Sequence, residues 1–446
     1  MNHFDKDEIE ELARISQFIQ RKGKLDGCTF LSLIVFNTNS LLDESLNDLT
    51  IELQQNYGID TISRQALHER FNKKAVLFVT SALEKLLNKQ LGEKSTFRSC
   101  GEFKRFLIKD SVCFQIDESL ADSYPGSGGG GSKANVRIQF EYDLLNGQIV
   151  DLSLNAFNEQ DAKDSTATLH LVEEGDLIVR DLAYMHLNAL QGIVNKVAHF
   201  LSRLNTQRKV YKEQNGQLEE LDFTAIVKFM RENDIKQYEE QVWLGKKKDL
   251  QVRLFLFLMP QSVYKERLRK ANINARKKGH QVSQEYKARA ALNLFITSAP
   301  KESIDIDTAW KIYTLRWQIE LTFKIWKSIC KIDKVKKVKK DRLECYIWAK
   351  LLMIVLCWRI VWFTAKLLNQ YYQKNLSFFK AFKTLMRDMV RIEQLISDRT
   401  LATGKYLVDF LQLSSQKHIL EKKKLSNYSA EVLVSSLTIT TETRGC

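Results

Sequence analysis

Near Phe103 the spacing of apolar residues changes from a helical to an alternating pattern. Upstream, helical spacing predicts helices over residues 7–20, 41–53, 63–70 and 75–91. Downstream, alternation predicts strands over residues 106–116, 136–142 and 148–154, and Asn146-Gly147 predicts a tight hairpin turn between the last two. Helices followed by a β-meander place the chain in the α/β or α+β class.

The remaining sequence continues this mixture. A short apolar strand at 177–179 runs into Arg180-Asp181, and a helix is expected at 184–197. Further strands are expected at 241–243, 252–259 and 292–297, a basic helix at 263–278, and a largely uninterrupted helical region from 308 to about 396. The apolar stretch 346–365 contains Lys350 and Arg359, and the charge-free run between them is too short for a bilayer, so a buried core helix is expected.

Three local patterns bear on function. The helices at 63–70 and 75–91 could form a helix-turn-helix DNA reader or part of an ordinary helical bundle. Gly126, Gly128 and Gly131 match the G-x-G-x-x-G spacing, but a strand follows them, so a flexible loop is expected at 126–132. The seven cysteines include no C-x-x-C pair, which argues against a disulfide framework or a structural zinc site and for a reducing cytosol.

The net charge of the chain points to a polyanionic partner. Lys and Arg number 68 against 54 Asp and Glu, a net charge of +14, which suggests nucleic acid or an anionic membrane surface. Residues 324–342 hold nine basic and two acidic side chains, and residues 265–278 hold seven and one. Residues 1–100 hold 13 basic and 14 acidic side chains, which weakens the helix-turn-helix interpretation.

Four polar residues fall on one face of an expected helix. At about 100° per residue, Tyr313, Arg316, Glu320 and Lys327 share a narrow stripe, and other faces of the helix are apolar. A helix that is apolar on several faces is buried, so the stripe is expected to face a cleft and bind phosphate groups. An Arg316–Glu320 ion pair on a solvated face would have the same spacing, and the spacing alone leaves both interpretations open.

Two further carboxylates lie where an unpaired charge is unfavourable. Asp110 falls in the middle of the first expected strand, and Asp181 follows the apolar strand 177–179. Metal-assisted phosphoryl transfer needs several oxygen ligands around two cations. Two Asp on strands and one Glu on a helix are the ligand set that a two-metal nuclease site requires.

These residues together resemble a known family. Asp110-Ser111, the segment Tyr-Pro-Gly-Ser-Gly-Gly at 124–129, Asp181, and Tyr313, Arg316, Glu320 and Lys327 in a Y-x2-R-x3-E-x6-K signature are similar to the DDE transposases of bacterial insertion sequences, specifically the insertion-sequence-four family. The resemblance covers roughly residues 60–350. The chain departs from the family at Val112, where relatives usually carry Thr, and at Asp117, which is a second candidate for the first carboxylate.

The resemblance implies an α/β fold with an RNase H-like catalytic core interrupted by a β-rich insertion. Its expected divisions are a helical DNA-binding region at 1–100, the core at 101–204 and 292–365, the insertion at 205–291, and a helical region at 366–446 that is a candidate for dimerisation. Asp110, Asp181 and Glu320 would hold two Mg²⁺ or Mn²⁺ ions. The two basic runs would then form the walls of a DNA channel.

The resemblance also implies cut-and-paste transposition in the bacterial cytoplasm, in association with the nucleoid. The enzyme would nick double-stranded DNA at the terminal inverted repeats, often form a hairpin there, and join the 3′-OH to target DNA. Tyr313, Arg316 and Lys327 would contact DNA phosphates, and Trp243 would hold a flipped base. A homodimer would bring the two ends into a synaptic complex.

Two functions of other classes remain as alternatives. A non-catalytic, transposase-derived inhibitor would bind the same DNA, although the intact signature and both Asp positions argue against decay. A protein bound to a membrane surface would also be basic, but Lys350 and Arg359 speak against insertion of the apolar stretch.

Overall fold

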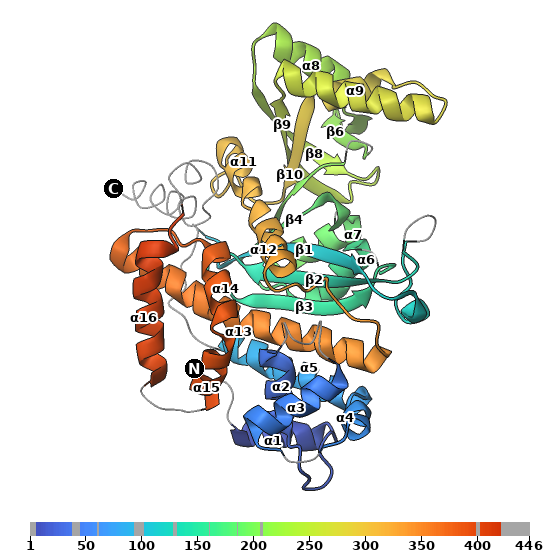
Figure 1. Cartoon of the computed structure of the whole chain (residues 1–446). Coiled ribbons are helices and arrows are strands. Elements are labelled where there is room, and N and C mark those ends of the chain that lie inside the picture. The colour runs from blue at the N-terminus through green and yellow to red at the C-terminus, as the bar shows by residue number, and fades with distance from the viewer. Residues whose placement is uncertain are drawn as a thin grey trace.

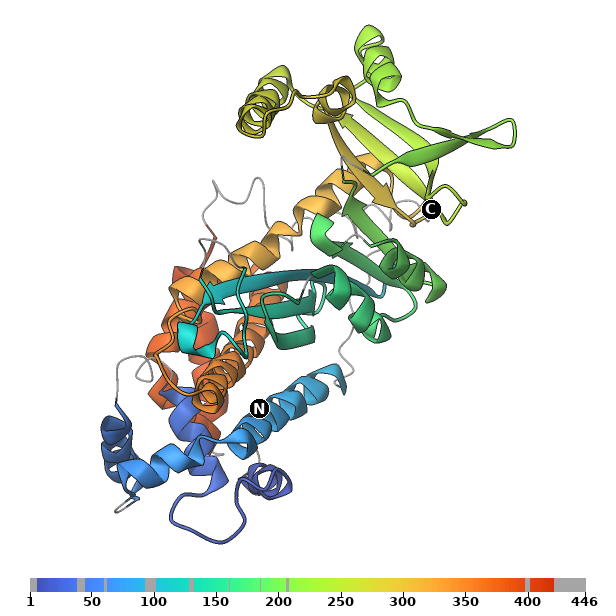
Figure 2. The ribbon, with the colours of Figure 1, turned by 90° about the vertical axis from the view of Figure 1, so that its right-hand side faces the viewer.

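The computed structural model describes residues 6–37, 45–59, 62–92, 102–127, 132–159, 161–184, 186–205, 208–397 and 402–420. Figures 1 and 2 show an elongated molecule in which a group of helices, a central sheet, and a smaller unit of strands and helices follow one another along the long axis. The expected mixture of helices and strands is confirmed. The expected helix at 41–53 lies partly outside the described residues, as do Gly128 and Gly131 of the glycine-rich segment.

One mixed sheet runs through the molecule. Within the described residues it has ten strands in the order β3-β2-β1-β4-β5-β10-β9-β8-β6-β7. β4 and β5 run parallel to β1, and the other pairings are antiparallel. The strands are β1 (Arg105–Gln115), β2 (Asn135–Asp143), β3 (Ile149–Ala156), β4 (Asp176–Arg180), β5 (His199–Arg203), β6 (Val210–Gln214), β7 (Gln217–Glu220), β8 (Gln237–Leu244), β9 (Leu250–Leu258) and β10 (Leu292–Thr297).

The expected hairpin at Asn146-Gly147 is confirmed, and it joins β2 to β3. Gly147 has a φ of 72°, a left-handed value that favours glycine. The ring of Trp362 also lies where a Cβ would be, since the nearest ring carbon would be 2.3 Å away. The indole of Trp358 donates to the Gly147 carbonyl at 2.7 Å, so this turn is fixed to the long helix α13 (Lys340–Tyr372).

Helices cover both faces of the sheet around β1. One face packs on α12 (Trp317–Ser328), α13 and α5 (Lys73–Gly92), where the ring of Phe140 lies 4.8 Å from Trp326 and 5.7 Å from Trp358. The other face is covered by α6 (Asp161–Ala167), α7 (Leu187–Asn195) and the short 3₁₀ helices η3 (Thr168–Leu171) and η4 (Leu182–Tyr184). This arrangement buries β1 on both sides (Figure 1).

Helix α13 is a buried core helix, as expected for residues 346–365. It is long and apolar enough to cross a membrane, but 67% of its most apolar window is buried inside the protein. Lys350 on this helix is buried as well, and its ammonium group donates to the carbonyls of Lys331 and Lys334, both at 2.8 Å.

The N-terminal helices form a bundle that packs on α13. Phe71, which follows α4 (Arg64–Arg70), is buried, and its ring lies 5.4 Å from the ring of Tyr346. Helix α5 contacts α13 and β3 along its length, so the structure places both helices of the possible DNA reader in a bundle. The remaining helices of this region are α1 (Lys6–Ile15), α2 (Gly27–Phe36) and α3 (Leu46–Tyr57).

Strands β6 to β9 and β10 build the smaller unit at the other end (Figure 2). Helices α8 (Phe223–Glu232), α9 (Gln261–Lys277) and α10 (Gln284–Ala290) pack on one side of these strands around a second apolar cluster. The sheet continues without a break from β5 through β10 into β9, which ties this unit to the central strands.

The expected helical region from 308 to about 396 is confirmed over most of its length, but it consists of several helices and a loop interrupts it. Helix α11 (Ile306–Thr314) ends before α12, a loop follows at 329–339, and α14 (Phe378–Arg387), α15 (Met389–Ser397) and α16 (Ala402–Lys417) come after α13. Between α11 and α12 the amides of Arg316 and Ile319 bond to carbonyls three residues back, which tightens the chain into a 3₁₀ turn. No Pro or Gly marks this turn in the sequence.

Candidate active site

The register of two parallel strands brings Asp110 and Asp181 together. Lys109 of β1 pairs with Arg180, the last residue of β4. Asp110, the next residue of β1, therefore lies beside Asp181, which directly follows β4. Side chains alternate between the faces of a strand, and Ile108 and Val179, two residues earlier, lie in the core beneath α12 and α13. Both carboxylates therefore lie on the face that α12 covers, on neighbouring strands roughly 4.8 Å apart.

The third carboxylate comes from α12 and shares a cation with the first. The guanidinium of Arg316 donates to Asp110 Oδ2 at 3.2 Å and to Glu320 Oε1 at 2.6 Å. Arg316 lies in the 3₁₀ turn before α12, and Glu320 lies one helical turn further on. The side chains of Arg316, Asp110 and Glu320 are 15%, 22% and 32% exposed, so this is a recessed group and not the solvated ion pair that the spacing also allowed.

The electrostatics of Asp110 follow from this setting. The pKa of Asp110 is raised to about 6, mainly by burial and also by the nearby charges of Asp181 and Glu320, although the N–H of Ser111 and the charge of Arg316 lower it. Burial also raises the pKa of Tyr313 to about 12. The guanidinium of Arg316 lies 6.0 Å from the Tyr313 ring centre, so the Tyr, Arg and Glu of the stripe form one cluster.

The chemistry of this group fits a divalent cation. Carboxylate oxygens are the ligands of Mg²⁺ and Mn²⁺ in proteins, and Asp110, Asp181 and Glu320 provide three carboxylates that interact electrostatically. The guanidinium of Arg316 acts as a substitute cation between two of them. Among the residues that the structure describes, no three His, Cys, Asp or Glu side chains lie close enough to share a metal ion, and Arg316 lies between Asp110 and Glu320.

Lys327 lies further along α12, over the end of β1. Its ammonium group donates to the carbonyl of Cys113 at 3.3 Å, and the side chain is exposed. Seven residues of helix separate Lys327 from Glu320, which is roughly 10.5 Å along the axis. The four signature residues therefore run in one direction along β1.

Two other residues considered from the sequence lie elsewhere. Trp243 is on β8, five strands from β1 in the sheet, which is roughly 24 Å. Lys248 lies 5.8 Å from the Trp243 ring centre. Asp117 lies beyond β1, where its carboxylate caps the 3₁₀ helix η2 (Glu118–Leu120) and pairs with Lys337 at 3.7 Å. The structure joins neither of them to the three carboxylates.

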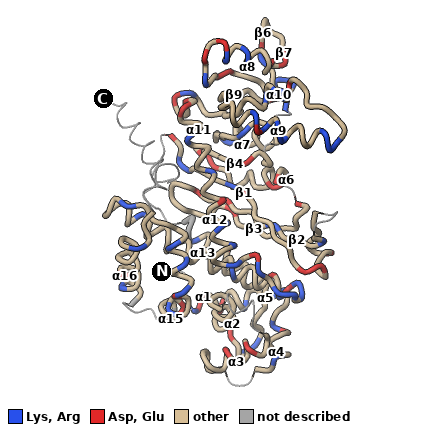
Figure 3. The backbone as a smooth tube through the Cα atoms, turned by 45° about the horizontal axis from the view of Figure 1, so that its top comes forward, with Lys and Arg blue, Asp and Glu red and all other residues tan. Residues whose placement is uncertain are grey.

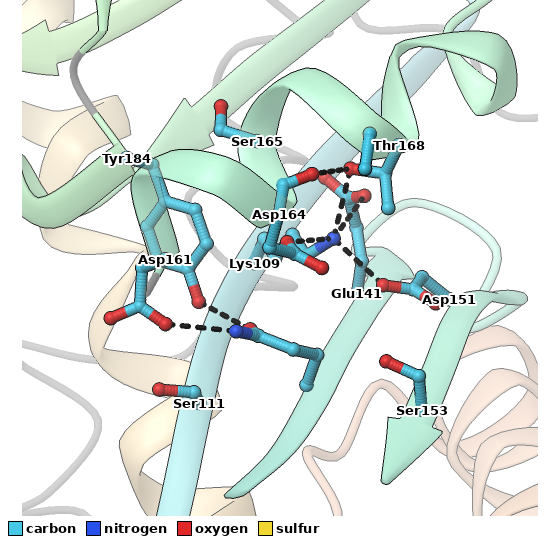
Figure 4. A network of polar contacts seen from close by, with 12 residues as sticks. Lys109, Ser111, Glu141, Asp151, Ser153, Asp161, Asp164, Ser165, Thr168 and Tyr184 are labelled. Carbon is cyan, nitrogen blue, oxygen red and sulfur yellow. Dashed lines mark hydrogen bonds and ion pairs between the residues drawn. The ribbon is translucent and has the colours of Figure 1, made fainter. Parts of the chain in front are cut away.

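A buried charged network lies directly behind the site, and it was not foreseen from the sequence (Figure 4). Lys109, next to Asp110 but on the opposite face of β1, is fully buried. Its ammonium group lies 2.7 Å from Asp151, 2.6 Å from Asp164 and 3.9 Å from Glu141. The sequence does contain an indication of this network, because a lysine in the middle of a buried strand needs a carboxylate partner.

A second buried ion pair extends this network to β4. Arg180 donates to both carboxylate oxygens of Glu141 on β2, at 2.7 and 3.0 Å, and to the hydroxyl of Ser165 on α6 at 3.1 Å. On the same face, Tyr184 donates to Gln139 at 2.6 Å. These contacts tie β2 and β4 together on both sides of β1, and so they fix the register that places Asp110 beside Asp181.

The chain is similar to known transposases over most of its length. The family model described as Transposase DDE domain matches residues 101–356. The transposase for insertion sequence element IS231F of Bacillus thuringiensis subsp. israelensis is 30% identical, over 98% of this chain and 94% of the relative. That for IS231E of Bacillus thuringiensis subsp. finitimus is 31% identical, over 94% and 92%. That for IS1151 of Clostridium perfringens is 28% identical, over 86% and 84%.

A solved structure is also similar. The cryo-EM structure of a piggyBac transposase synaptic complex with hairpin DNA aligns with 92% of this chain and 83% of its own, at a TM-score of 0.46 and 11% sequence identity.

Proposed function

The chain belongs to the DDE transposases of bacterial insertion sequences, and from this premise we propose that Asp110, Asp181 and Glu320 are the residues that cut and join DNA. One observation carries the proposal. Carboxylates from β1, from the end of β4 and from α12 converge, two of them on the single guanidinium of Arg316. The elements that provide them all lie within the matched residues 101–356.

The division of the chain into parts is proposed along with the site. Residues 101–204 and 292–365 would form an RNase H-like core, supported by β1, β4 and α12 carrying the three carboxylates. Residues 205–291 would be the β-rich insertion, supported by β6 to β9 and α8 to α10, which all lie within that range. The helices of 1–100 would contribute to DNA binding and those of 366–446 to dimer contacts.

Two Mg²⁺ or Mn²⁺ ions are the proposed cofactors, held by Asp110, Asp181 and Glu320. When bound, such ions lower the pKa of water or of a 3′-OH and stabilise the leaving oxygen. The raised pKa of Asp110 supports the assignment, because a carboxylate held in its ionised form there needs a cation beside it. In the protein alone Arg316 provides that positive charge.

The basic and aromatic residues of the stripe are proposed to hold the DNA. Arg316 is the candidate for the phosphate next to the cut bond, since it lies between Asp110 and Glu320. Lys327 would hold the backbone further along α12. Tyr313 packs against both Arg316 and the ring of Phe295, whose centre is 4.8 Å away, and so would orient the guanidinium.

The reaction is proposed to be cut-and-paste transposition. Hydrolysis at a terminal inverted repeat would free a 3′-OH, which would attack the opposite strand and close a hairpin. Hydrolysis of the hairpin would free the 3′-OH again, and it would then attack target DNA. Trp243 is the proposed contact for a flipped base. Trp243 lies five strands from β1, so it would contact a base some distance from the cut bond and not the base next to that bond.

A homodimer is proposed to join the two ends in a synaptic complex in the bacterial cytoplasm, associated with the nucleoid. The C-terminal helices are the candidate contact. They and the end of α13 expose apolar side chains, among them Phe363 at 51%, Tyr371 at 67%, Val390 at 62% and Val408 at 63%. Homodimer contacts are rich in apolar side chains, which supports these helices as the candidate contact.

The proposal is tested with Asp181→Asn and a duplex carrying the terminal inverted repeat that flanks the gene. Binding rests mainly on basic side chains, so we expect the variant to keep the wild-type Kd and to lose nicking in Mg²⁺ or Mn²⁺ on denaturing gels. Asp122→Asn, an exposed Asp on the turn after η2, is the matched control and should nick normally. Wild-type nicking by Asp181→Asn would contradict the site.

The same experiment separates the alternative function. A wild-type protein that binds the duplex but cuts it in neither metal would be a non-catalytic DNA-binding inhibitor. The arrangement favours the enzyme, because Asp110 and Glu320 are paired with Arg316 and Asp181 interacts with it electrostatically, and recessed acids facing DNA would weaken binding alone.

A further inference from the structure

A basic cavity lies at the end of α12, past the three carboxylates. Its volume is about 620 Å³, and it is lined by residues 115–117 at the end of β1 and by seven residues between 327 and 337. The lining includes four lysines, Lys327, Lys331, Lys334 and Lys337, which all have exposed side chains. Only Lys327 belongs to the signature stripe.

The loop at 329–339, which carries Lys331, Lys334 and Lys337 and is called the lysine loop below, has its backbone fixed by α13. The buried ammonium group of Lys350 donates to the carbonyls of Lys331 and Lys334, both at 2.8 Å. Ile332 between them is fully buried, and Lys331 has a φ of 50°, so the loop turns sharply at that point. The main chain is therefore anchored in the core, while the lysine side chains of the loop remain in solvent beside the cavity.

The cavity keeps a positive charge after its own acidic residues are counted. Asp117 and Asp333 are the acidic residues of the lining, against four lysines, so the net charge is +2. The Asp117–Lys337 and Asp333–Lys334 pairs are 3.7 and 3.6 Å apart, and their lysines are 78% and 68% exposed. Exposed pairs of this kind are weak, so a phosphodiester can compete for these lysines.

The distance from the cavity to the three carboxylates can be expressed in nucleotides of a bound DNA strand. Lys327 on its edge lies roughly 10.5 Å along α12 from Glu320. A DNA strand rises by roughly 3.4 Å per nucleotide, so the cavity is about three nucleotides from the carboxylates. The lysines of the loop extend the line of the stripe in the same direction.

We propose that this cavity binds the sugar–phosphate backbone of a DNA strand about three nucleotides from the cut bond, with Lys331, Lys334 and Lys337 as its specific contacts. Held there, the strand presents one phosphodiester to Asp110, Asp181 and Glu320, so the cavity determines where the cut falls. The inference rests on the proposed function, because it presumes that these carboxylates cleave DNA.

The test replaces the three loop lysines together, as Lys331→Gln, Lys334→Gln and Lys337→Gln. The matched control removes three exposed lysines that lie outside the proposed DNA and dimer contacts, as Lys104→Gln, Lys163→Gln and Lys301→Gln. Both triple variants lose the same charge at exposed positions, and circular dichroism melting should show both folded. Binding to the terminal-repeat duplex is measured in the Asp181→Asn background at several salt concentrations.

We expect the loop variant to bind roughly tenfold more weakly and its slope of log K against log salt to fall by about 2.7, since each of the three phosphate contacts contributes about 0.9. The control should keep both values. A methylphosphonate, which is uncharged, is then placed at each linkage in turn. At about the third nucleotide it should weaken wild-type binding and have no further effect on the loop variant.

With its carboxylates intact, the loop variant should also nick at several neighbouring linkages instead of one. Equal Kd and slope in the loop and control variants, or a methylphosphonate effect that persists in the loop variant, would overturn the inference while wild-type nicking upheld the proposed function. A wild-type protein that binds the duplex but never nicks it would overturn the proposed function instead.

Discussion

The carboxyl group of Asp110 is held where its ionised form is unfavourable. Burial raises its pKa from 3.8 to about 6, although Ser111 and Arg316 both stabilise the charge. A group whose pKa is raised in the folded state binds protons more tightly there than in the unfolded chain. Its contribution to stability is therefore complete below pH 3.8 and is lost as the pH rises through about 6.

Replacing Asp110 by Asn should thus stabilise the metal-free protein at neutral pH. A shift of this size corresponds to at most about 3 kcal/mol, reduced by solvent because the side chain is partly exposed. We expect the melting temperature of Asp110→Asn to exceed that of wild type at pH 7 and to approach it near pH 4. Added Mg²⁺ should raise the melting temperature of wild type only. A difference that does not vary with pH would count against this account of Asp110.

Lys109 is the counterpart of Asp110 on the other face of β1. Its fully buried ammonium group is paired with Asp151 and Asp164. Lys109→Met would leave these carboxylates buried without a cation, which typically costs about 3–5 kcal/mol. We expect a loss of this order in urea unfolding. The exposed Lys104→Met is the control, and the prediction fails if the two variants unfold at the same urea concentration.

At the scale of single elements, the strands were predicted well where a short apolar or alternating segment is bounded by polar residues. β1, β2, β3 and β10 match the predicted segments to within two residues at each end. Helix α2 was missed because its sequence is almost wholly apolar, so it carries no helical period. The charged network around Lys109 was missed because its members come from β1, β2, β3 and α6, and only the folded sheet brings them together.

The candidate site was predicted as residues but not as geometry. The Arg316–Glu320 pair follows from helical spacing, whereas the bond from Arg316 to Asp110 joins residues 206 positions apart. The 3₁₀ turn before α12, which aims Arg316 at β1, has no sequence marker such as Pro or Gly. Sequence spacing can align side chains within one helix but cannot show which strand the helix crosses.

Helix α13 carries an element-scale prediction through Lys350. Burial lowers the pKa of Lys350 from 10.5 to about 8, so the folded state disfavours its charged form. Below pH 8 the buried charge of Lys350 lowers the free energy of unfolding by its full amount. This loss of stability decreases as the pH rises from about 8 to about 10.5. Over that interval this residue should increase the free energy of unfolding by at most about 3 kcal/mol.

The measurement compares wild type with Lys350→Met in urea at pH 7.5, 9 and 10.5. The stability of wild type relative to the variant should rise with pH, since Met does not titrate. The exposed Lys366→Met on the same helix should show no such trend. A constant difference between wild type and Lys350→Met would mean that Lys350 stays charged throughout this range.

At the scale of the whole molecule, the basic charge is divided between two distant places. One run, at 324–342, contains Lys327 and the lysine loop next to the carboxylates, and the other, at 265–278, lies on α9 in the smaller unit. Figure 3 shows Lys and Arg along α9, and Figure 1 places α9 at the opposite end of the molecule from α5. A duplex that contacts both runs must extend along the sheet past β10 and β9.

The two runs should therefore affect catalysis in different ways. Lys270, Lys277 and Lys278 on or just after α9 are exposed. Because they lie far from the carboxylates, they should hold the ground state and the transition state equally. Lys270→Gln, Lys277→Gln and Lys278→Gln together should then raise KM for the terminal-repeat duplex roughly tenfold at low salt and leave kcat and the cut position unchanged.

Nicking kinetics at two salt concentrations check this. The variant should approach wild type as salt weakens the contacts of both proteins. An unchanged KM would mean that α9 does not contact the DNA and that the duplex binds only near the central strands. A fall in kcat without a change in KM would instead mean that α9 acts on the reacting end itself, which would require DNA to bend back from the carboxylates toward the smaller unit.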